Sequence, residues 1–284
     1  MQLWYALVDL LPFSWAEPGS MYFMKNALLA VLVISPLFAL LSTLVVEHGM
    51  AFFSDALGHS AFAGLAIGSL CGLADATWAA VALSVVFSLL FTWVVQKTAM
   101  SSDTVIGVFS STAIALGIFL STLDGGSFTK FNALLIGDIL SVSPGKIGLL
   151  ALILLLVVIL WVFQMNDMTL SAVHPALASS RGIRLWQLDA LFNCAVAVVV
   201  TLSMTWVGLL VINSLLVLPG AAARQLAGNM RQYTLLALLG AVVCGVGGLL
   251  LSFYVGSSTG SCITLLLAGY FFVAFALGRG RARP

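Results

Sequence analysis

Long apolar segments recur along almost the whole chain and restrict its fold more than any other feature of the sequence. A helix that crosses a lipid bilayer needs about 20 mainly apolar residues. Only 7% of the residues are charged, whereas soluble domains average about 25%. The sequence therefore predicts an all-α polytopic membrane protein. Seven segments are candidate spans: Ala27 to Val46, Ser54 to Leu73, Ala76 to Val95, Thr104 to Leu123, Ile147 to Phe163, Tyr233 to Phe253 and Cys262 to Leu277.

A longer apolar block runs from Leu188 to Leu218, and as one helix it would be about 46 Å long. This length exceeds the hydrocarbon core of about 30 Å, so we expect two helices that meet near Gly208. The bundle then has nine transmembrane helices; a single strongly tilted helix would make eight. The apolar stretch Phe131 to Leu140 is too short to cross and is expected to be a re-entrant or interfacial helix.

No linker divides the chain, so residues 23–278 are predicted to form one transmembrane domain. Residues 1–22 lack the basic start of a signal peptide and carry aromatic residues typical of the membrane–water boundary. They are expected to form an interfacial lead-in, and residues 279–284 to form a basic cytoplasmic tail.

Lys and Arg accumulate in cytoplasmic loops and so indicate orientation. If the C-terminus is cytoplasmic, most of the 11 basic residues lie on that side, and the N-terminus lies outside. The cytoplasmic set is then Lys97, Arg181, Arg184, Arg224, Arg231, Arg279, Arg281 and Arg283.

Two ionisable residues, Asp55 and His59, interrupt the second apolar segment. A charge at the bilayer centre costs at least ~2.5–3.5 kcal/mol, so some interaction must offset it. Residues four apart share one face of a helix. Gly64 and Gly68 have the small-xxx-small spacing that lets helix backbones approach closely. We therefore expect this helix inside the bundle, with its polar face toward a cavity.

A carboxylate and an imidazole are a common ligand pair for Zn²⁺, Mn²⁺ or Fe²⁺. Asp55 and His59 are therefore candidate metal ligands, and the cation would neutralise the carboxylate. Two alternatives stay open: a proton relay, and an Asp–His hydrogen bond that joins helices without metal. A site that must release its ion needs fewer protein ligands than a structural one.

The motifs of zinc proteases and of P-loop motors are missing from the sequence. It contains no H-E-x-x-H, and the pair Gly145-Lys146 is followed by Ile147 rather than by the Ser or Thr of a P-loop. The chain is expected to be a transport subunit and not an enzyme, without a permanently bound cofactor or a nucleic-acid partner. If it pumps, an ATPase on another subunit supplies the energy.

Four segments, in order, resemble motifs of the permease subunits of bacterial ABC importers for zinc, manganese or iron. They are SDALGHSAFAGLAIG, DTVIGVFSSTAIALGIFL, LLIGDILSVS and VGLLVINSLLVLPGAAAR. Each motif alone is weakly specific, but four in the same order over most of residues 25–277 are a strong signal.

The resemblance implies a homodimeric permease around a central pathway in the bacterial plasma (inner) membrane. It also implies two cytoplasmic ATPase subunits and an extracytoplasmic protein that delivers the metal. Asp55 and His59 match the family's ion-contacting D-x-x-x-H. The segment Pro219 to Gln232 matches a cytoplasmic ATPase-docking loop, in which Pro219 is expected to end a helix. Its candidate docking residues are Pro219, Gly220, Arg224 and Arg231.

Some positions depart from the family pattern. Gly58 and Ala63 stand where Ser and Pro are common, and His174 replaces an acidic residue and is expected to be a solvated loop residue. Asn213 and Phe62 are candidate pathway-lining residues, with an interhelical hydrogen bond as the alternative for Asn213. The main alternative function is a self-sufficient, proton-coupled secondary metal carrier; a structural or assembly factor is a third possibility.

Overall fold

Long helices make up most of the structure. The computed structural model describes Trp4, Tyr5, Val8, Asp9 and residues 21–98, 100–123, 137 and 139–278. Among these residues, eight helices are long and apolar enough to cross a membrane. They are α2 (Tyr22–Glu47), α4 (Thr77–Lys97), α5 (Ser102–Leu123), α7 (Pro144–Val173), α9 (Leu185–Val207), α10 (Leu209–Leu226), α11 (Met230–Val255) and α12 (Thr259–Gly278).

A further long helix, α3 (Phe53–Leu70), carries Asp55 and His59. The described part also contains two short helices, the 3-10 helix η1 (Ile139–Ser141) and α8 (Pro175–Ser180). This agrees with the predicted bundle of eight to nine membrane helices. Most of the predicted short helix between Phe131 and Leu140 lies outside the described residues, as does the tail 279–284.

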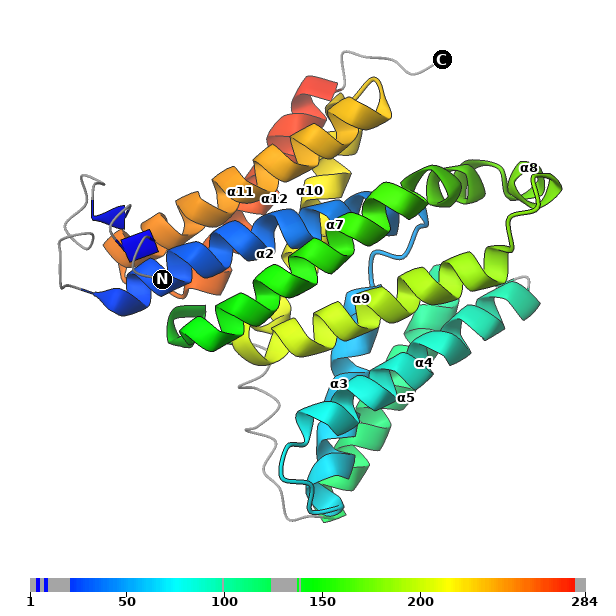
Figure 1. The fold of residues 1–284 in the computed structure, drawn as a ribbon, viewed down its shortest axis with the longest axis horizontal. Helices are drawn as coiled ribbons and strands as arrows, with labels where there is room; N and C mark the ends of the chain where they lie inside the picture. The colour runs from blue at the N-terminus through cyan, green and yellow to red at the C-terminus, as the bar shows by residue number, and fades with distance from the viewer. Residues whose placement is uncertain are drawn as a thin grey trace.

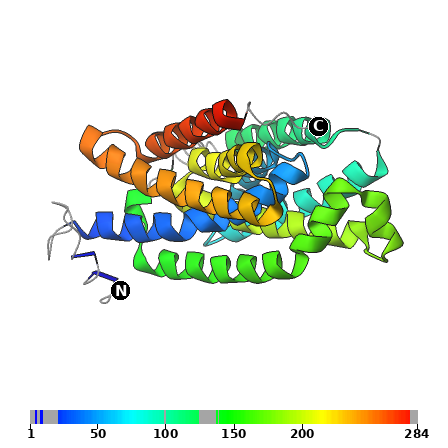
Figure 2. The same ribbon diagram turned by 90° about the horizontal axis from the view of Figure 1, so that it is seen from above.

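The larger of two groups of helices contains α2, α7, α10, α11 and α12, and α2 lies at its centre. Helix α2 packs against α7 on one side and against α10 and α11 on the other (Figures 1 and 2). A second group is formed by α3, α4 and α5, and α9 and α10 contact both groups. Residues of α2 such as Leu37 and Phe38 are fully buried, whereas Leu155 and Phe163 of α7 are exposed. In a membrane this exposed apolar surface faces lipid.

The predicted break in the long apolar block is confirmed. α9 ends at Val207, α10 begins at Leu209, and Gly208 between them has φ 91°. Residues with a Cβ atom rarely adopt this backbone conformation, so glycine at this position permits the chain to change direction between α9 and α10. Gly137 lies directly against the Gly208 backbone, where a Cβ atom would overlap it.

Helix α7 is longer than the predicted span Ile147 to Phe163. It has 30 residues and continues to Val173. Polar residues such as Gln164, Asn166 and Asp167 end the apolar run without breaking the helix. The helix ends only at His174, which precedes Pro175 and is exposed as expected.

The prediction that Pro219 ends a helix is wrong, because α10 continues through it to Leu226. A proline inside a helix removes one backbone donor and disturbs the turn before it. Here Ser42 of α2 supports that turn: the Gly220 N–H donates to Ser42 Oγ at 2.9 Å. Within a bilayer, neighbouring Ser and Thr side chains commonly satisfy backbone groups near a proline.

We expect Ser42→Ala to lower the free energy of unfolding by about 0.5–1.5 kcal/mol, because it removes this buried hydrogen bond. The measurement is the unfolding midpoint of the purified protein in detergent. Ser35→Ala is the matched control: Ser35 is on the same helix and equally buried, but its Oγ has no hydrogen-bond partner among the described residues. Equal effects of the two substitutions would contradict the assignment.

The described residues of the N-terminal lead-in pack against the start of α2. The Trp4 indole N–H donates to the Lys25 carbonyl oxygen and the Tyr5 hydroxyl to Asn26 Oδ1, both at 2.9 Å. Lys25 is fully buried and forms an ion pair with Asp9. The remainder of residues 1–22 lies outside the described residues, so its interfacial position stays a prediction.

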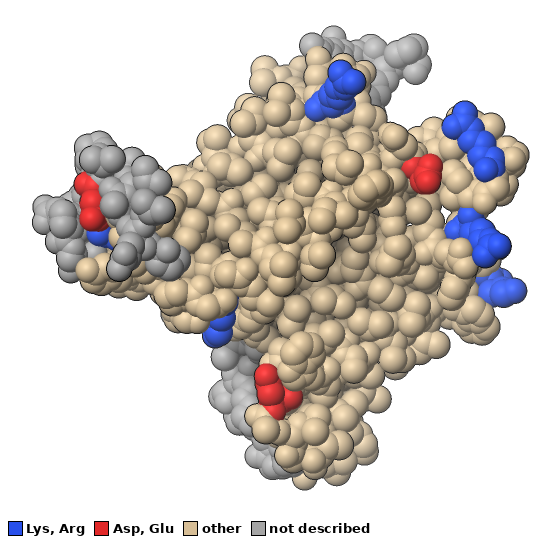
Figure 3. All heavy atoms as spheres, viewed as in Figure 1, with Lys and Arg blue, Asp and Glu red and all other residues tan. Residues whose placement is uncertain are grey.

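Charged side chains lie mainly near helix ends. In the space-filling view they are found around the rim of the molecule, and its middle is almost free of them (Figure 3). Lys97 is in the last turn of α4, Arg224 is in the last turn of α10, and Lys146 is in the first turn of α7. Asp75 lies outside the helices, and hydrogen bonds from Thr77 lower the pKa of its carboxyl group.

Candidate metal-ion site

Asp55 and His59 lie together in the first two turns of α3. His59 Nε2 is 3.3 Å from Asp55 Oδ2. This is longer than most N–H···O hydrogen bonds, which span about 2.7–3.2 Å. Two donors bound to one Zn²⁺ at about 2.0–2.2 Å, in a roughly tetrahedral arrangement, lie about 3.3–3.5 Å apart. The separation therefore suits two ligands of a single ion.

A third polar side chain, Asn213 of α10, meets the pair. Its Nδ2 donates to Asp55 Oδ1 at 3.2 Å, which joins residues 158 positions apart in the sequence. The predicted interhelical hydrogen bond of Asn213 is thus present, and it lies at the candidate site. The Asn213 Oδ1 atom is buried and has no hydrogen-bond partner among the described residues. This oxygen is a further candidate metal ligand beside Asp55 and His59.

The site has an open side. The Asp55 side chain is 42% exposed, whereas the His59 side chain is 12% exposed. Beyond Asn213, α10 continues for thirteen residues, or about 20 Å, and α3 continues for fifteen residues beyond Asp55, or about 22 Å. The Asp55 carboxylate is therefore partly exposed and lies far from the C-terminal ends of α3 and α10.

Small residues allow α3 to reach this position. A Cβ atom on Gly58 would lie 2.5 Å from Leu209 of α10, and one on Gly64 would lie 2.5 Å from the Ala80 Cα of α4. Gly68 also packs closely against α4, as the small-xxx-small spacing predicted. Glycine at these positions brings α3 near enough to α10 for Asp55 to meet Asn213.

Phe62 lies between α3 and α5. It is 5% exposed, and a Cβ atom on Gly117 of α5 would overlap its ring. This is a helix-packing position, so the described contacts add no support to a pathway-lining role, which stays a prediction.

The four candidate docking residues do not form one loop. Pro219 and Gly220 are buried inside α10, where Gly220 packs on Ser42. Arg224 is in the last turn of α10, and Arg231 is in the first turn of α11. Only residues 227–229 separate these two helices, and Asn229 caps α11 by accepting from the Gln232 N–H at 2.9 Å. The segment Pro219 to Gln232, which was expected to be a loop, therefore consists of the end of α10, a three-residue connection and the start of α11.

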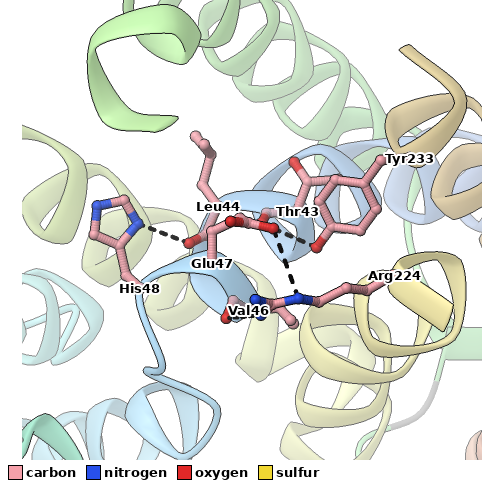
Figure 4. A network of polar contacts seen from close by, with 7 residues as sticks. All are labelled: Thr43, Leu44, Val46, Glu47, His48, Arg224 and Tyr233. Atoms are coloured by element: carbon pink, nitrogen blue, oxygen red, sulfur yellow. Dashed lines mark hydrogen bonds and ion pairs between the residues drawn. The ribbon is translucent and has the colours of Figure 1, made fainter. Parts of the chain in front are cut away.

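Arg224 also places a positive charge beside the end of α2. The segment that follows α2, residues 48–52, contains no Lys or Arg of its own. The Arg224 Nε is 3.9 Å from Glu47 Oε1, and the Tyr233 hydroxyl donates to the Thr43 carbonyl oxygen at 3.2 Å (Figure 4). Glu47, Arg224 and Tyr233 line a cavity of about 220 Å³ beside residues 227–230. The short α10–α11 connection thus borders a hollow at this end of the bundle.

These observations define a class of protein: a helical membrane protein with a polar pair inside the bundle. One imidazole, one carboxylate and a neighbouring carboxamide are its candidate ligands for a cation, and so small a set suits binding and release better than permanent retention.

The chain belongs to the ABC 3 transport family, whose model matches residues 20–278. It is 29% identical to the probable iron transport system membrane protein of Haemophilus influenzae, over 95% of this chain and 100% of that protein. It is 28% identical to the high-affinity zinc uptake system membrane protein ZnuB of the same organism, over 86% of this chain and 94% of that protein.

The fold also resembles a solved structure, PsaBC from Streptococcus pneumoniae in complex with Fab. The TM-score is 0.77 at 24% sequence identity, and the match covers 97% of this chain and 95% of that chain. The predicted family and fold class are thus confirmed. The proton-coupled secondary carrier receives no support from these relatives.

Proposed function

We propose that this chain is the membrane-spanning permease subunit of an ATP-driven importer for a divalent metal ion, Zn²⁺, Mn²⁺ or Fe²⁺, in the bacterial plasma membrane. The observation that carries the proposal is the Asp55–His59 pair, with Nε2 and Oδ2 3.3 Å apart and the carboxylate open on one side. Membership of the ABC 3 transport family and the printed functions of the zinc and iron relatives support it.

The metal ion is the cargo of the site rather than a resident cofactor. Asp55 neutralises part of its charge and His59 supplies a nitrogen ligand, while the Asn213 amide holds the second carboxylate oxygen. Because these protein ligands do not complete a coordination shell, water or a second copy of the chain fills the remaining positions. An incomplete shell favours release when the pathway opens to the other side.

The proposed orientation places the N-terminus outside and the C-terminus in the cytoplasm. Lys97 at the end of α4, Arg181 and Arg184 between α8 and α9, and Arg224 and Arg231 at the α10–α11 connection then face the cytoplasm. This distribution follows the preference of Lys and Arg for cytoplasmic loops.

Three protein partners complete the proposal. The sequence has no P-loop of its own, so a cytoplasmic ATPase subunit supplies the energy. The connection 227–229, which is exposed at Gly228 and Asn229, is the proposed contact for that subunit, together with Arg224 and Arg231 beside it. An extracytoplasmic metal-binding protein delivers the ion, and a second copy of the chain completes a homodimer around the pathway.

We expect the complex, purified with its ATPase subunit and placed in lipid vesicles, to accumulate radioactive Zn²⁺ or Mn²⁺ only when ATP and the delivery protein are supplied. The measurement is ion retained per vesicle over time. A complex whose ATPase subunit lacks its P-loop lysine is the control, and it should retain no ion above background. Uptake driven by a proton gradient without ATP would overturn the proposal.

A further inference from the structure

A second pocket, lined by both polar and apolar side chains and with a volume of about 70 Å³, lies at the end of the bundle that is proposed to face the cytoplasm. It is formed where α2 and α4 end and where α5 and α9 begin. Its polar lining residues include His48, Gln96, Asp189 and Asn193. The volume is large enough for an ion with a small number of water molecules.

His48 has the hydrogen bond that usually prepares a histidine to bind metal. Its Nδ1 is 2.9 Å from the Leu44 carbonyl oxygen (Figure 4), so the Nδ1–H donates to that oxygen, which leaves Nε2 as the nitrogen that a metal ion can bind in the neutral ring. The ring is also stacked on Phe192, with centroids 6.1 Å apart. Among the described residues, Nε2 has a polar contact, at 3.5 Å with Ser171 Oγ, whose hydroxyl donates to the Met168 carbonyl oxygen at 2.8 Å.

Asp189 and Asn193 are held in place from α4. They are four residues apart on α9 and therefore share a face. Gln96 Nε2 donates to Asp189 Oδ2 at 2.8 Å, and Asn193 Nδ2 donates to Thr92 Oγ1 at 2.9 Å. Thr92 and Gln96 are also four residues apart, so two turns of α4 orient two turns of α9.

One acceptor in this pocket is left without a donor. Asn193 is only 3% exposed, and its Oδ1 atom has no hydrogen-bond partner among the described residues. A buried carbonyl oxygen without a partner is unfavourable unless a ligand or water satisfies it. This atom and the side chains of Asp189 and His48, which line the same pocket, are candidate ligands for a cation.

The same three donor types occur at the site on α3. There the carboxylate, imidazole and carboxamide come from Asp55, His59 and Asn213. The two sites are neighbours in the fold: Phe53, two residues before Asp55, packs against Phe91 of the second pocket with ring centroids 4.8 Å apart. This ring contact connects α3, which carries the first site, with the lining of the second pocket.

We propose that His48, Asp189 and Asn193 form a second, cytoplasmic-side binding site for the transported divalent cation, which receives the ion after it leaves Asp55 and His59. The identity of the ion rests on the proposed function. Two weak sites in series let an ion move on without being trapped, as conduction through a pathway requires.

The test measures Zn²⁺ binding to the complex with its ATPase subunit, in lipid nanodiscs without ATP, by equilibrium dialysis and metal analysis. The double variant Asp55→Asn/His59→Gln removes the first site, and we expect it to retain one Zn²⁺ per permease chain. Adding His48→Gln or Asp189→Asn should weaken that remaining binding by about 10-fold or more. Adding Asn193→Asp instead should tighten it, because a carboxylate replaces the amide.

His174→Gln and Asp167→Asn are the matched controls, because both residues are exposed and neither lines the pocket. We expect them to leave the Zn²⁺ affinity unchanged. Elution as a single assembled species checks that each variant is folded, and Asn193→Asp gives a gain that unfolding cannot imitate.

Zn²⁺ binding that is absent from the double variant, or unaffected by His48→Gln and Asp189→Asn, would overturn the second site. The proposed function would survive that result if ATP-driven uptake still required Asp55 and His59. Conversely, a complex that binds Zn²⁺ at His48 but shows no ATP-driven uptake would refute the proposed function alone.

Discussion

Asp55→Ala and His59→Ala should each reduce ATP-driven metal uptake by about 100-fold or more, with the amount of assembled protein unchanged. Loss of a residue that merely orients a metal ligand commonly lowers affinity or activity by about 10–100-fold, and these two residues are the proposed ligands themselves. Asp55→Ala removes the Asn213 hydrogen bond to α10, but the Asp55 side chain is 42% exposed and the close packing of α3 through Gly58 and Gly64 is unchanged, so we expect the protein to assemble.

The measurement pairs radioactive Zn²⁺ or Mn²⁺ uptake with quantitative immunoblotting of the membrane fraction. Asp167→Asn and His174→Ala serve as controls, since they change the same residue types at exposed positions outside both sites. A structural Asp–His pair would give a different pattern, in which abundance falls and uptake per molecule is preserved. That pattern would remove the basis of the proposed site.

The second large effect is expected from a single methyl group at Gly64. A Cβ atom there would lie 2.5 Å from the Ala80 Cα and 2.9 Å from the Ala79 carbonyl oxygen. These are backbone atoms of α4, so the helices must separate to admit it. Overpacking of this kind typically costs about 1–3 kcal/mol, although alanine is otherwise the better helix former by up to about 1 kcal/mol.

We therefore expect Gly64→Ala to lower the unfolding midpoint and the level of folded protein, and to disturb the approach of α3 to its neighbours. Gly107→Ala on α5 is the matched control, because no heavy atom of the described residues, apart from the adjacent backbone of α5 itself, lies within 4 Å of a Cβ atom at that position. Thermal unfolding of both variants in the same detergent provides the comparison. If Gly64→Ala is as stable as Gly107→Ala, then α3 and α4 do not pack as closely as described.

Much of the fold was accessible from local sequence pattern. Apolar segments near 20 residues long predicted the membrane helices, and the excessive length of one block predicted the break that Gly208 makes. Both inferences rest on helix rise and bilayer thickness, which hold regardless of neighbouring helices. For the same reason, the spacing of Asp55 and His59 was enough to place them on one helical face.

Other features could not be read in this way. Proline ordinarily ends a helix, but α10 continues through Pro219 with Ser42, 178 residues away, bonded to the adjacent Gly220 N–H. The polar residues after Phe163 ended the apolar signal although α7 continued to Val173. At Pro219, a tertiary hydrogen bond outweighed the tendency of proline to end a helix. After Phe163, the loss of apolar residues gave no information on where α7 ends.

The sequence alone thus determined a helical membrane protein with one carboxylate and one imidazole aligned within a span, because period and hydropathy are local properties. Only the tertiary structure decided which distant groups meet them. Asn213 reaches Asp55 across 158 residues, and His48 of the α2 end shares a pocket with Asp189 of α9. These contacts between distant residues depend on how closely the helices pack at their glycines, and the sequence of a single helix does not determine that packing.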